Sequence, residues 1–383
     1  MNNCWPTAKL GEVLKRVERF ESRDELTEYP FAGTYSFAHG IFVGVRKFGS
    51  TFALPKVQRI REGDFVYCKI MAWEGAFGLV PKEADNCVLS GAFVVYELND
   101  KRIDPKFLDY FFKVPAHWQS IGSQSSGTNV RRQSLHPTQF EKAEVPLPPL
   151  AEQRLIVTRI EELAAKVHEA RDLRKQAVDQ AEALCRSILS DDKEPRPTPM
   201  HELVRLRPPD VLVRPEETYQ FAGVYCFGRG VFRGEKKTGL DFAYTRLTRL
   251  HGGNFVYPKL MAWEGALGVV PPECDGCVVS TEFPVFEVIE EKVLPEVLDT
   301  YFRTPAVWPE IAGASTGTNV RRRRLNPKDF LNYHIPLPSR VTQDRLRKVQ
   351  AQVNTLKSLQ AETLVELDAL IPSILDKAFR GEL

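Results

Sequence analysis

Two long stretches of this chain have the hydrophobic spacing of a coiled-coil helix. The first covers residues 150–190 and contains neither glycine nor proline. Its apolar residues alternate between spacings of four and three, interrupted only at Arg174, which predicts a helix that pairs with another helix. The apolar positions are Ile156, Ile160, Leu163, Val167, Ala170, Ala177, Ala181, Leu184 and Ile188.

The second stretch covers residues 340–383. Gln360 and Thr363 interrupt its apolar stripe, so the register is expected to shift there. Pro372 is expected to kink or end the helix near Leu370, because proline lacks an N–H and clashes with the preceding turn. Its apolar positions are Leu346, Val349, Val353, Leu356, Leu367, Leu370 and Ile374. We expect the two helices to form an antiparallel coiled coil with each other.

The segments before these helices are copies of one another. Adding 190 to a residue number in the first copy gives its counterpart in the second, without a gap from Tyr29 to Pro148. Residues 63–81 and 253–271 agree at 14 of 19 positions, and SGTNVRR at 126–132 becomes TGTNVRR at 316–322. Because the repeat continues without a gap over about 120 residues, it indicates a duplicated domain and not a short-period solenoid.

Within each copy, short β-like runs alternate with short amphipathic helices. Residues 65–70 and 277–289 are predicted as strands. Residues 105–113 and 295–303 are predicted as helices that end before Pro115 and Pro305. The predicted fold class is therefore α+β, with two duplicated mixed α/β domains separated by the two long helices. The predicted boundaries are 1–149, 150–190, a proline-rich linker at 191–199, 200–339 and 340–383.

Composition narrows the class of protein. A chain of 383 residues exceeds one hydrophobic core. It has no apolar run long enough to span a membrane and no secretory signal at its start, so we expect a cytoplasmic protein. The net charge of +2 favours no partner by itself. Cys274 and Cys277 form one CxxC pair, but Ala84 and Cys87 stand opposite them, so no metal site is expected.

The repeated GTNVRR segment is the best candidate for contact with DNA. Glycine lets backbone N–H groups approach phosphate, and asparagine and arginine can bind adenine and guanine in a bidentate manner. The alternative is a solvated charged turn. The second copy continues into Arg323 and Arg324. The candidate residues are Thr128, Asn129, Arg131, Arg132, Thr318, Asn319, Arg321, Arg322 and Arg323.

The segment most alike between the copies begins at Lys69 and Lys259. These lysines could reach a phosphate. Trp73 and Trp263 within the segment are expected to belong to the core. Glu74 and Glu264 could accept a hydrogen bond from cytosine or brace the fold, and the sequence leaves both possibilities open.

A polar stretch near the start of each copy differs between them. If both domains bind DNA, this is where their base preferences could separate, and the alternative is drift on an unselected surface. The candidate specificity residues are Ser36, His39, Arg46, Arg229 and Lys236. No methyltransferase motif and no dinucleotide-binding glycine motif is present, so the sequence gives little support for catalysis.

The chain resembles the DNA specificity (S) subunit of type I restriction–modification systems. The resemblance rests on Gly127-Thr128 leading into VPLPPLAEQRLIV (145–157) and on the closing SILDKAFRGEL (373–383). In the second copy the proline-rich block becomes PLPSRVTQDRL (336–346), which retains Gln343.

That resemblance implies a non-catalytic subunit with two target-recognition domains, each reading half of a bipartite site in double-stranded DNA. It also implies that the helices act as a spacer and dock methylation (M) subunits, two of them by expectation. S-adenosylmethionine would then belong to the M subunits, and ATP with Mg to restriction (R) subunits that cleave DNA, so this chain would hold no cofactor. Two alternatives stay open: another phage-defence methylation complex, and an interaction scaffold that binds no DNA.

Overall fold

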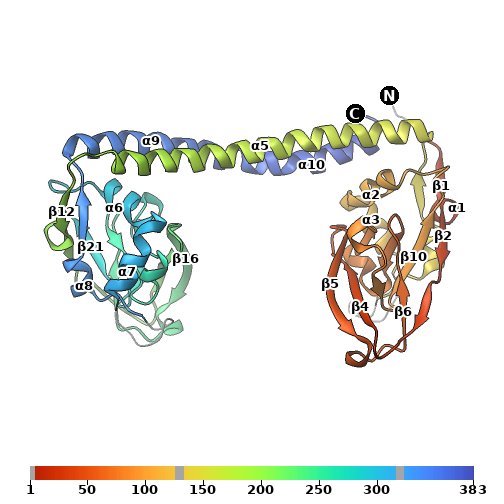
Figure 1. Ribbon diagram of the computed structural model, residues 1–383, viewed down its shortest axis with the longest axis horizontal. Coiled ribbons are helices and arrows are strands. Elements are labelled where there is room, and N and C mark those ends of the chain that lie inside the picture. Colours follow the sequence, from red (N-terminus) through yellow and green to blue (C-terminus); the bar gives the residue numbers. More distant parts are fainter. Residues whose placement is uncertain (1–4, 126–132, 316–322) are drawn as a thin grey trace. The chain divides into compact units, whose positions relative to one another are not determined.

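The computed structural model describes residues 5–125, 133–315 and 323–383. The chain divides into two compact units, which consist of residues 1–172 with 363–383 and of residues 173–362. Each unit contains one copy of the repeated domain and parts of both long helical segments (Figure 1). This arrangement confirms the predicted fold class.

The domain of the first unit has two main sheets and a small ribbon. The antiparallel four-stranded sheet has the order β2-β10-β7-β8, and the five-stranded sheet has the order β3-β6-β9-β4-β5 with β4 and β9 parallel. The ribbon pairs β1 with β11. The strands are β1 (Thr7–Lys9), β2 (Leu14–Val17), β3 (Phe20–Ser22), β4 (Glu28–Thr34), β5 (Ile41–Phe48), β6 (Lys56–Arg59), β7 (Phe65–Cys68), β8 (Phe77–Leu79), β9 (Val88–Leu89), β10 (Phe93–Leu98) and β11 (Glu144–Pro146).

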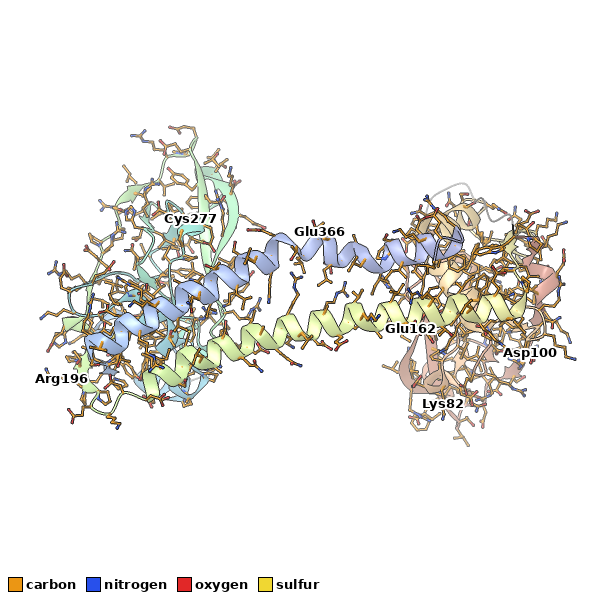
Figure 2. All side chains as sticks on the ribbon, turned by 90° about the horizontal axis from the view of Figure 1, so that it is seen from above. Lys82, Asp100, Glu162, Arg196, Cys277 and Glu366 are labelled. Carbon is orange, nitrogen blue, oxygen red and sulfur yellow. The ribbon has the colours of Figure 1, made fainter. Side chains whose placement is uncertain are left out.

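The domain of the second unit repeats this topology. Its sheets have the orders β13-β21-β18-β19 and β14-β17-β20-β15-β16, and its ribbon pairs β12 with β22. The strands are β12 (Arg196–Pro199), β13 (Val204–Leu206), β14 (Val211–Leu212), β15 (Thr218–Tyr225), β16 (Gly230–Thr238), β17 (Arg246–Arg249), β18 (Phe255–Val256), β19 (Gly268–Val269), β20 (Val278–Ser280), β21 (Val285–Val288) and β22 (His334–Leu337). Strand β12, which carries the Arg196 labelled in Figure 2, lies inside the segment predicted as a linker.

Short helices cover one side of each four-stranded sheet. In the first domain they are α1 (Leu10–Val13), α2 (Pro105–Lys113), α3 (Pro115–Gly122) and α4 (Pro137–Phe140). In the second they are α6 (Pro295–Phe302), α7 (Trp308–Ala314) and α8 (Pro327–Asn332). The two short helices predicted before Pro115 and Pro305 are α2 and α6. The core between helices and sheet is aromatic: Phe65, Phe77, Phe112 and Phe140 are fully buried together in the first unit.

Two strand predictions need correction. The predicted strand at 65–70 ends at Cys68, since Lys69–Glu74 forms a 3₁₀ turn. The predicted strand at 277–289 is two strands, β20 and β21, which belong to different sheets. A turn closed by a hydrogen bond from Phe283 N to Ser280 O at 2.9 Å separates them.

The long helices pair antiparallel within each unit. They are α5 (Leu150–Ser190), α9 (Arg340–Glu362) and α10 (Leu364–Phe379). In the first unit Ile156 of α5 and Ala378 of α10 line one groove, and Arg171 reaches Asp368 at 2.9 Å. In the second unit α5 and α9 also run antiparallel (Figures 1 and 2): Lys357 contacts Glu182, and Gln360, later in the chain, contacts Arg174, earlier in the chain. Among the described residues, no helix combines the length and the apolar character needed to cross a membrane.

The expectation that Pro372 could end the second helical segment is wrong. Thr363 separates α9 from α10, whereas Pro372 lies inside α10, which continues to Phe379. The interruption therefore falls where Gln360 and Thr363 disturb the apolar stripe. The predicted stripe is also locally wrong: Leu184 and Leu370 are exposed, and Cys185 and Leu375 are buried instead.

Candidate nucleic-acid interface

The strongest candidates from the sequence lie outside the described residues. They are Thr128, Asn129, Arg131, Arg132, Thr318, Asn319, Arg321 and Arg322. The residues that follow each of these segments are described, and they are hydrogen-bonded to the turn that begins at Lys69 in the first copy and at Lys259 in the second. We call this turn the lysine turn. Leu135 N donates to Lys69 O at 2.9 Å, and Leu325 N donates to Lys259 O at 2.9 Å. In both copies, therefore, the leucine that follows the GTNVRR segment by three residues is bound to the equivalent lysine.

The turn that begins at Lys69 is held against α3 by close packing around glycine. Gly75 ends the turn with φ of 77°, and a Cβ there would lie 2.8 Å from the ring of Trp118. A Cβ on Gly122 of α3 would lie 2.6 Å from Ala72 O. A side chain at either position would force α3 away from the turn. In the second copy Gly265 has the same φ and faces Trp308.

Trp73 and Trp263 do not belong to the core, contrary to the expectation from sequence. Both are half-buried and absent from the clusters of buried apolar residues. Trp73 Nε1 donates to Ile70 O at 3.1 Å. The buried Nε1 of Trp263 has no acceptor within the described part of the chain. The two tryptophans thus share a position but not a hydrogen bond. The acceptor in the first copy is a backbone carbonyl, and the backbone of the two turns differs, since the 3₁₀ turn covers Lys69–Glu74 in one copy and Ala262–Glu264 in the other.

Glu74 and Glu264 brace the tip of a hairpin. Ser36 Oγ donates to Glu74 Oε2 at 3.1 Å, and Phe37 N donates to Glu74 O at 2.7 Å. In the second copy Phe227 N donates to Glu264 O at 2.8 Å. Burial, and then the neighbouring Glu264 carboxylate, raise the pKa of the Cys226 thiol, which stands where the first copy has Ser36. The structure therefore supports the bracing role for these glutamates.

The five candidate specificity residues all lie on this hairpin, formed by β4–β5 in one copy and β15–β16 in the other. Strands β5 and β16 are edge strands, which leaves many of their side chains exposed. His39 and Arg229 are exposed at the tip, and Arg229 lies 4.2 Å from the Tyr225 ring centroid. Arg46 pairs with Glu28 at 3.0 Å, farther along the strand. Lys236 is exposed on β16. Ser36 alone among them contacts the lysine turn.

Lys69 and Lys259 have different surroundings. Lys259 Nζ donates to Thr281 O at 2.9 Å and lies 3.7 Å from Glu282 Oε1. No ion pair joins Lys69 to any carboxylate of the described residues. Arg323 is half-buried directly after the second GTNVRR segment. The lysine position is thus shared by the two copies, but its charge environment is not, and Arg323 has a glutamine, Gln133, as its counterpart.

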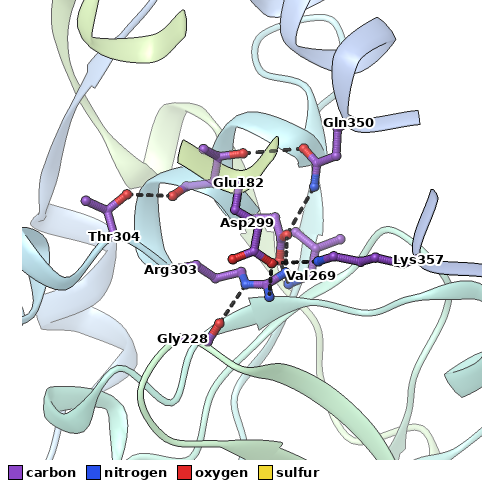
Figure 3. A network of polar contacts seen from close by, with 9 residues as sticks. Glu182, Gly228, Val269, Asp299, Arg303, Thr304, Gln350 and Lys357 are labelled. Atoms are coloured by element: carbon purple, nitrogen blue, oxygen red, sulfur yellow. Dashed lines mark hydrogen bonds and ion pairs between the residues drawn. The ribbon is translucent and has the colours of Figure 1, made fainter. Parts of the chain in front are cut away.

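The sequence did not reveal how the second domain is held against the helices. Arg303, the C-cap of α6, joins three elements. Its Nε donates to Gly228 O at 2.6 Å, and its guanidinium lies 3.2 Å from Asp299 and 3.6 Å from Glu182 of α5 (Figure 3). Lys357 of α9 also binds Glu182, at 2.6 Å. Asp299 has an aspartate, Asp109, as its counterpart in the first copy, but the counterpart of Arg303 is Lys113. The repeat therefore did not point to this network.

The cations of this network stabilise the ionised form of Glu182. Burial alone would raise the pKa of the Glu182 carboxyl, but the hydrogen bond and charge of Lys357, together with the charge of Arg303, lower it. In the first unit the corresponding contact is aromatic: Phe107 and Phe111 of α2 lie 5.1 and 5.6 Å from Phe379 of α10. At this place the two domains therefore contact their helices by different chemistry.

No metal site emerges from the described residues. They contain no group of three or more histidine, cysteine, aspartate or glutamate side chains that could hold an ion. Cys274 and Cys277 are buried free thiols, and burial raises the pKa of Cys274 to about 11. A protonated, enclosed thiol is a poor metal ligand.

Comparison with known proteins identifies the family. Residues 4–176 match the type I restriction modification DNA specificity domain. The chain is 22% identical over 321 residues to the EcoKI specificity subunit of Escherichia coli strain K12, covering 76% of this chain and 68% of that one. It is 22% identical over 375 residues to the EcoBI specificity subunit of Escherichia coli, covering 85% and 76%. The chain belongs to the type I restriction–modification specificity subunits. As such a subunit it provides DNA specificity and is itself non-catalytic.

Solved structures show the same fold. The HsdS subunit from Thermoanaerobacter tengcongensis is 24% identical, with a TM-score of 0.54, and the match covers 100% of this chain and 98% of that one. A chain from a study of complex assembly and conformational transition of the type I restriction–modification system is also 24% identical, with a TM-score of 0.63 and coverage of 99% and 98%. In this family the cofactors reside on the partner subunits.

Proposed function

We propose that each domain of this specificity subunit reads one half of a bipartite site in double-stranded DNA. The observation that carries this proposal is the common framework of the two copies. In each, the lysine turn is hydrogen-bonded to the chain leaving the GTNVRR segment, and it braces a hairpin whose exposed side chains differ. A constant basic element suits phosphate, which carries no sequence information, and a variable hairpin suits base edges.

The proposed phosphate contacts are Lys69, Lys259 and Arg323, together with the threonine, asparagine and arginine side chains of the two GTNVRR segments. The proposed base contacts are Ser36, His39 and Arg46 in the first domain and Arg229 and Lys236 in the second. Phosphate contacts release counterions, so each one lost should reduce the slope of log K against log salt by about 0.9.

The test uses the full chain and duplex DNA. Arg131→Ala with Arg132→Ala, and separately Lys69→Ala, should weaken binding and make the salt slope shallower by about one unit per lost contact. Lys193→Ala removes an exposed cation beyond the end of α5 and serves as the control. Unchanged affinity and slope in the double variant would rule out the GTNVRR segment as a DNA contact.

The helices would carry the partners. Several of their apolar residues are exposed, as expected for a surface that another subunit covers. These are Leu155, Leu173, Val341, Leu359, Leu364 and Val365. We propose that two M subunits dock there, with S-adenosylmethionine bound on them, and that R subunits bring ATP and Mg. The assembly would act on chromosomal DNA in the cytoplasm. Leu155→Lys and Val365→Lys should therefore reduce co-purification of the M subunits with this chain. If neither substitution reduces it, this docking surface is contradicted.

A further inference from the structure

The second domain places a carboxylate at a position where the first has a methyl group. Lys259 N donates to Glu282 O at 3.0 Å, just as Lys69 N donates to Ala92 O at 2.9 Å. Leu325 and Leu135 then bond to the two lysine carbonyls at the same distance. The backbone is therefore equivalent in the two copies, and Glu282 corresponds to Ala92.

The side chain of Glu282 pairs with two cations of the candidate interface. Its carboxylate lies 2.5 Å from the Arg324 guanidinium and 3.7 Å from Lys259 Nζ. The first domain has serine at position 134, where the second has Arg324, and alanine at position 92. The second domain thus has an added cation and an added anion at the same place, next to the shared lysine.

This cluster is weak enough to open. The side chains of Lys259, Glu282 and Arg324 are 22%, 39% and 45% exposed. Ion pairs at such exposure contribute little to stability and are screened by salt. A DNA phosphate could take the place of the carboxylate on both cations, but it would have to approach a fixed negative charge while doing so.

We propose that Glu282 competes with DNA phosphate for Lys259 and Arg324, and so lowers the attraction of the second domain to DNA of any sequence. Since binding without sequence preference comes almost entirely from phosphate contacts, a carboxylate that pairs with two cations lowers that binding more than it lowers recognition of bases. This inference rests on the proposed function, because it assumes that the lysine turn faces DNA.

The test is a reciprocal exchange in the full chain. Glu282→Ala installs the residue of the first domain, and Glu282→Gln removes the charge while keeping the shape. Both should tighten binding to a random-sequence duplex by about three- to tenfold near 0.1 M salt, and steepen the salt slope by about one to two units. Ala92→Glu should do the opposite in the first domain. Weaker or unchanged binding by both Glu282 variants would overturn the proposal.

Two further variants separate this proposal from the proposed function. If Lys259→Ala and Arg324→Ala weaken binding but the Glu282 variants do not strengthen it, the competing role is wrong and DNA contact stands. If neither Lys259→Ala nor Arg324→Ala changes the affinity or the salt slope, this turn does not contact DNA and both ideas fail for it. Agreement between Glu282→Ala and the isosteric Glu282→Gln, with an unchanged melting temperature for both, would exclude partial unfolding as the cause of a gain in affinity.

Discussion

The side-chain oxygen of Gln153 accepts a hydrogen bond from the backbone N–H of Asp104 at 2.8 Å. The glutamine is completely buried, and its Nε2 donates to Arg102 O and Pro148 O. Asp104 is the N-cap of α2, so this one amide fixes the start of α5 to the start of a domain helix. Gln343 does the same in the second unit, with Leu294 N at 2.9 Å and Pro338 O at 3.0 Å. The glutamine of the proline-rich block is therefore a joint between domain and helix.

Replacing either glutamine should loosen only its own unit. Gln153→Ala leaves the N–H of Asp104 buried without an acceptor, which costs about 1–3 kcal/mol. We expect faster hydrogen exchange in residues 104–113 and no change in residues 294–302. Gln343→Ala should give the reverse pattern. Gln176→Ala, an exposed glutamine of α5, is the control. Equal effects of Gln153→Ala on both units would show that the joints are not independent.

Arg303 should stabilise the attachment of the second domain far more than Lys113 stabilises the first. Arg303→Ala removes bonds to Gly228, Asp299 and Glu182 and is expected to cost about 1–2 kcal/mol, allowing for partial exposure. Lys113 pairs with Asp109 within α2, so Lys113→Ala should cost less than about 0.5 kcal/mol. Hydrogen exchange of α6 and α2 measures each loss, and similar losses would contradict this assignment.

The first unit should lose stability as the pH falls. His117 stacks on Phe111 at 4.1 Å and contacts Phe379, and burial lowers its pKa although Asp376 and a bond to Phe111 O oppose this. Its folded pKa lies below the unfolded value of about 6.5, so the unfolded chain binds the proton first. Stability is therefore complete above about pH 6.5 and declines as the pH drops from there to the folded pKa.

Substitution of this histidine provides the check. His117→Val installs the counterpart residue, Val307, and should remove this part of the pH dependence. The measurement is hydrogen exchange of residues 105–122 at about pH 7.5 and 5.5, with rates corrected for intrinsic chemistry. A variant that kept the full pH dependence would place the titrating group elsewhere.

The two half-sites should resemble each other. Domains this similar, on helices that run antiparallel, are expected to read related half-sites on opposite strands. The target would then be close to an interrupted palindrome with a spacer of roughly one helical turn. Sequencing of methylated DNA from a host that carries this subunit would reveal the target. Two unrelated half-sites would contradict the prediction.

Much of the architecture was decided by the sequence itself. The gapless repeat determined that there are two domains of one topology, because equivalent residues at equal spacing bury equivalent cores. The apolar stripe from Ile156 to Ile188 determined α5, since apolar residues spaced alternately by four and three, without glycine or proline, are typical of a coiled-coil helix. The proline-rich block and the GTNVRR segment led to the family. The roles of single residues in binding DNA stay predictions.

The tertiary structure decided which residues act together. Pro372 does not end its helix, and Trp73 is half-buried outside the core, although the local sequence predicted otherwise in both cases. Glu182 forms an ion pair with Arg303 although the two residues lie far apart in the chain. Neither the hydrophobic periodicity nor the repeat could predict this ion pair, because Lys113 stands in place of Arg303 in the first copy. The same holds for Glu282. Sequence repetition reveals what two domains share, whereas the contacts that distinguish them depend on side chains brought together by folding.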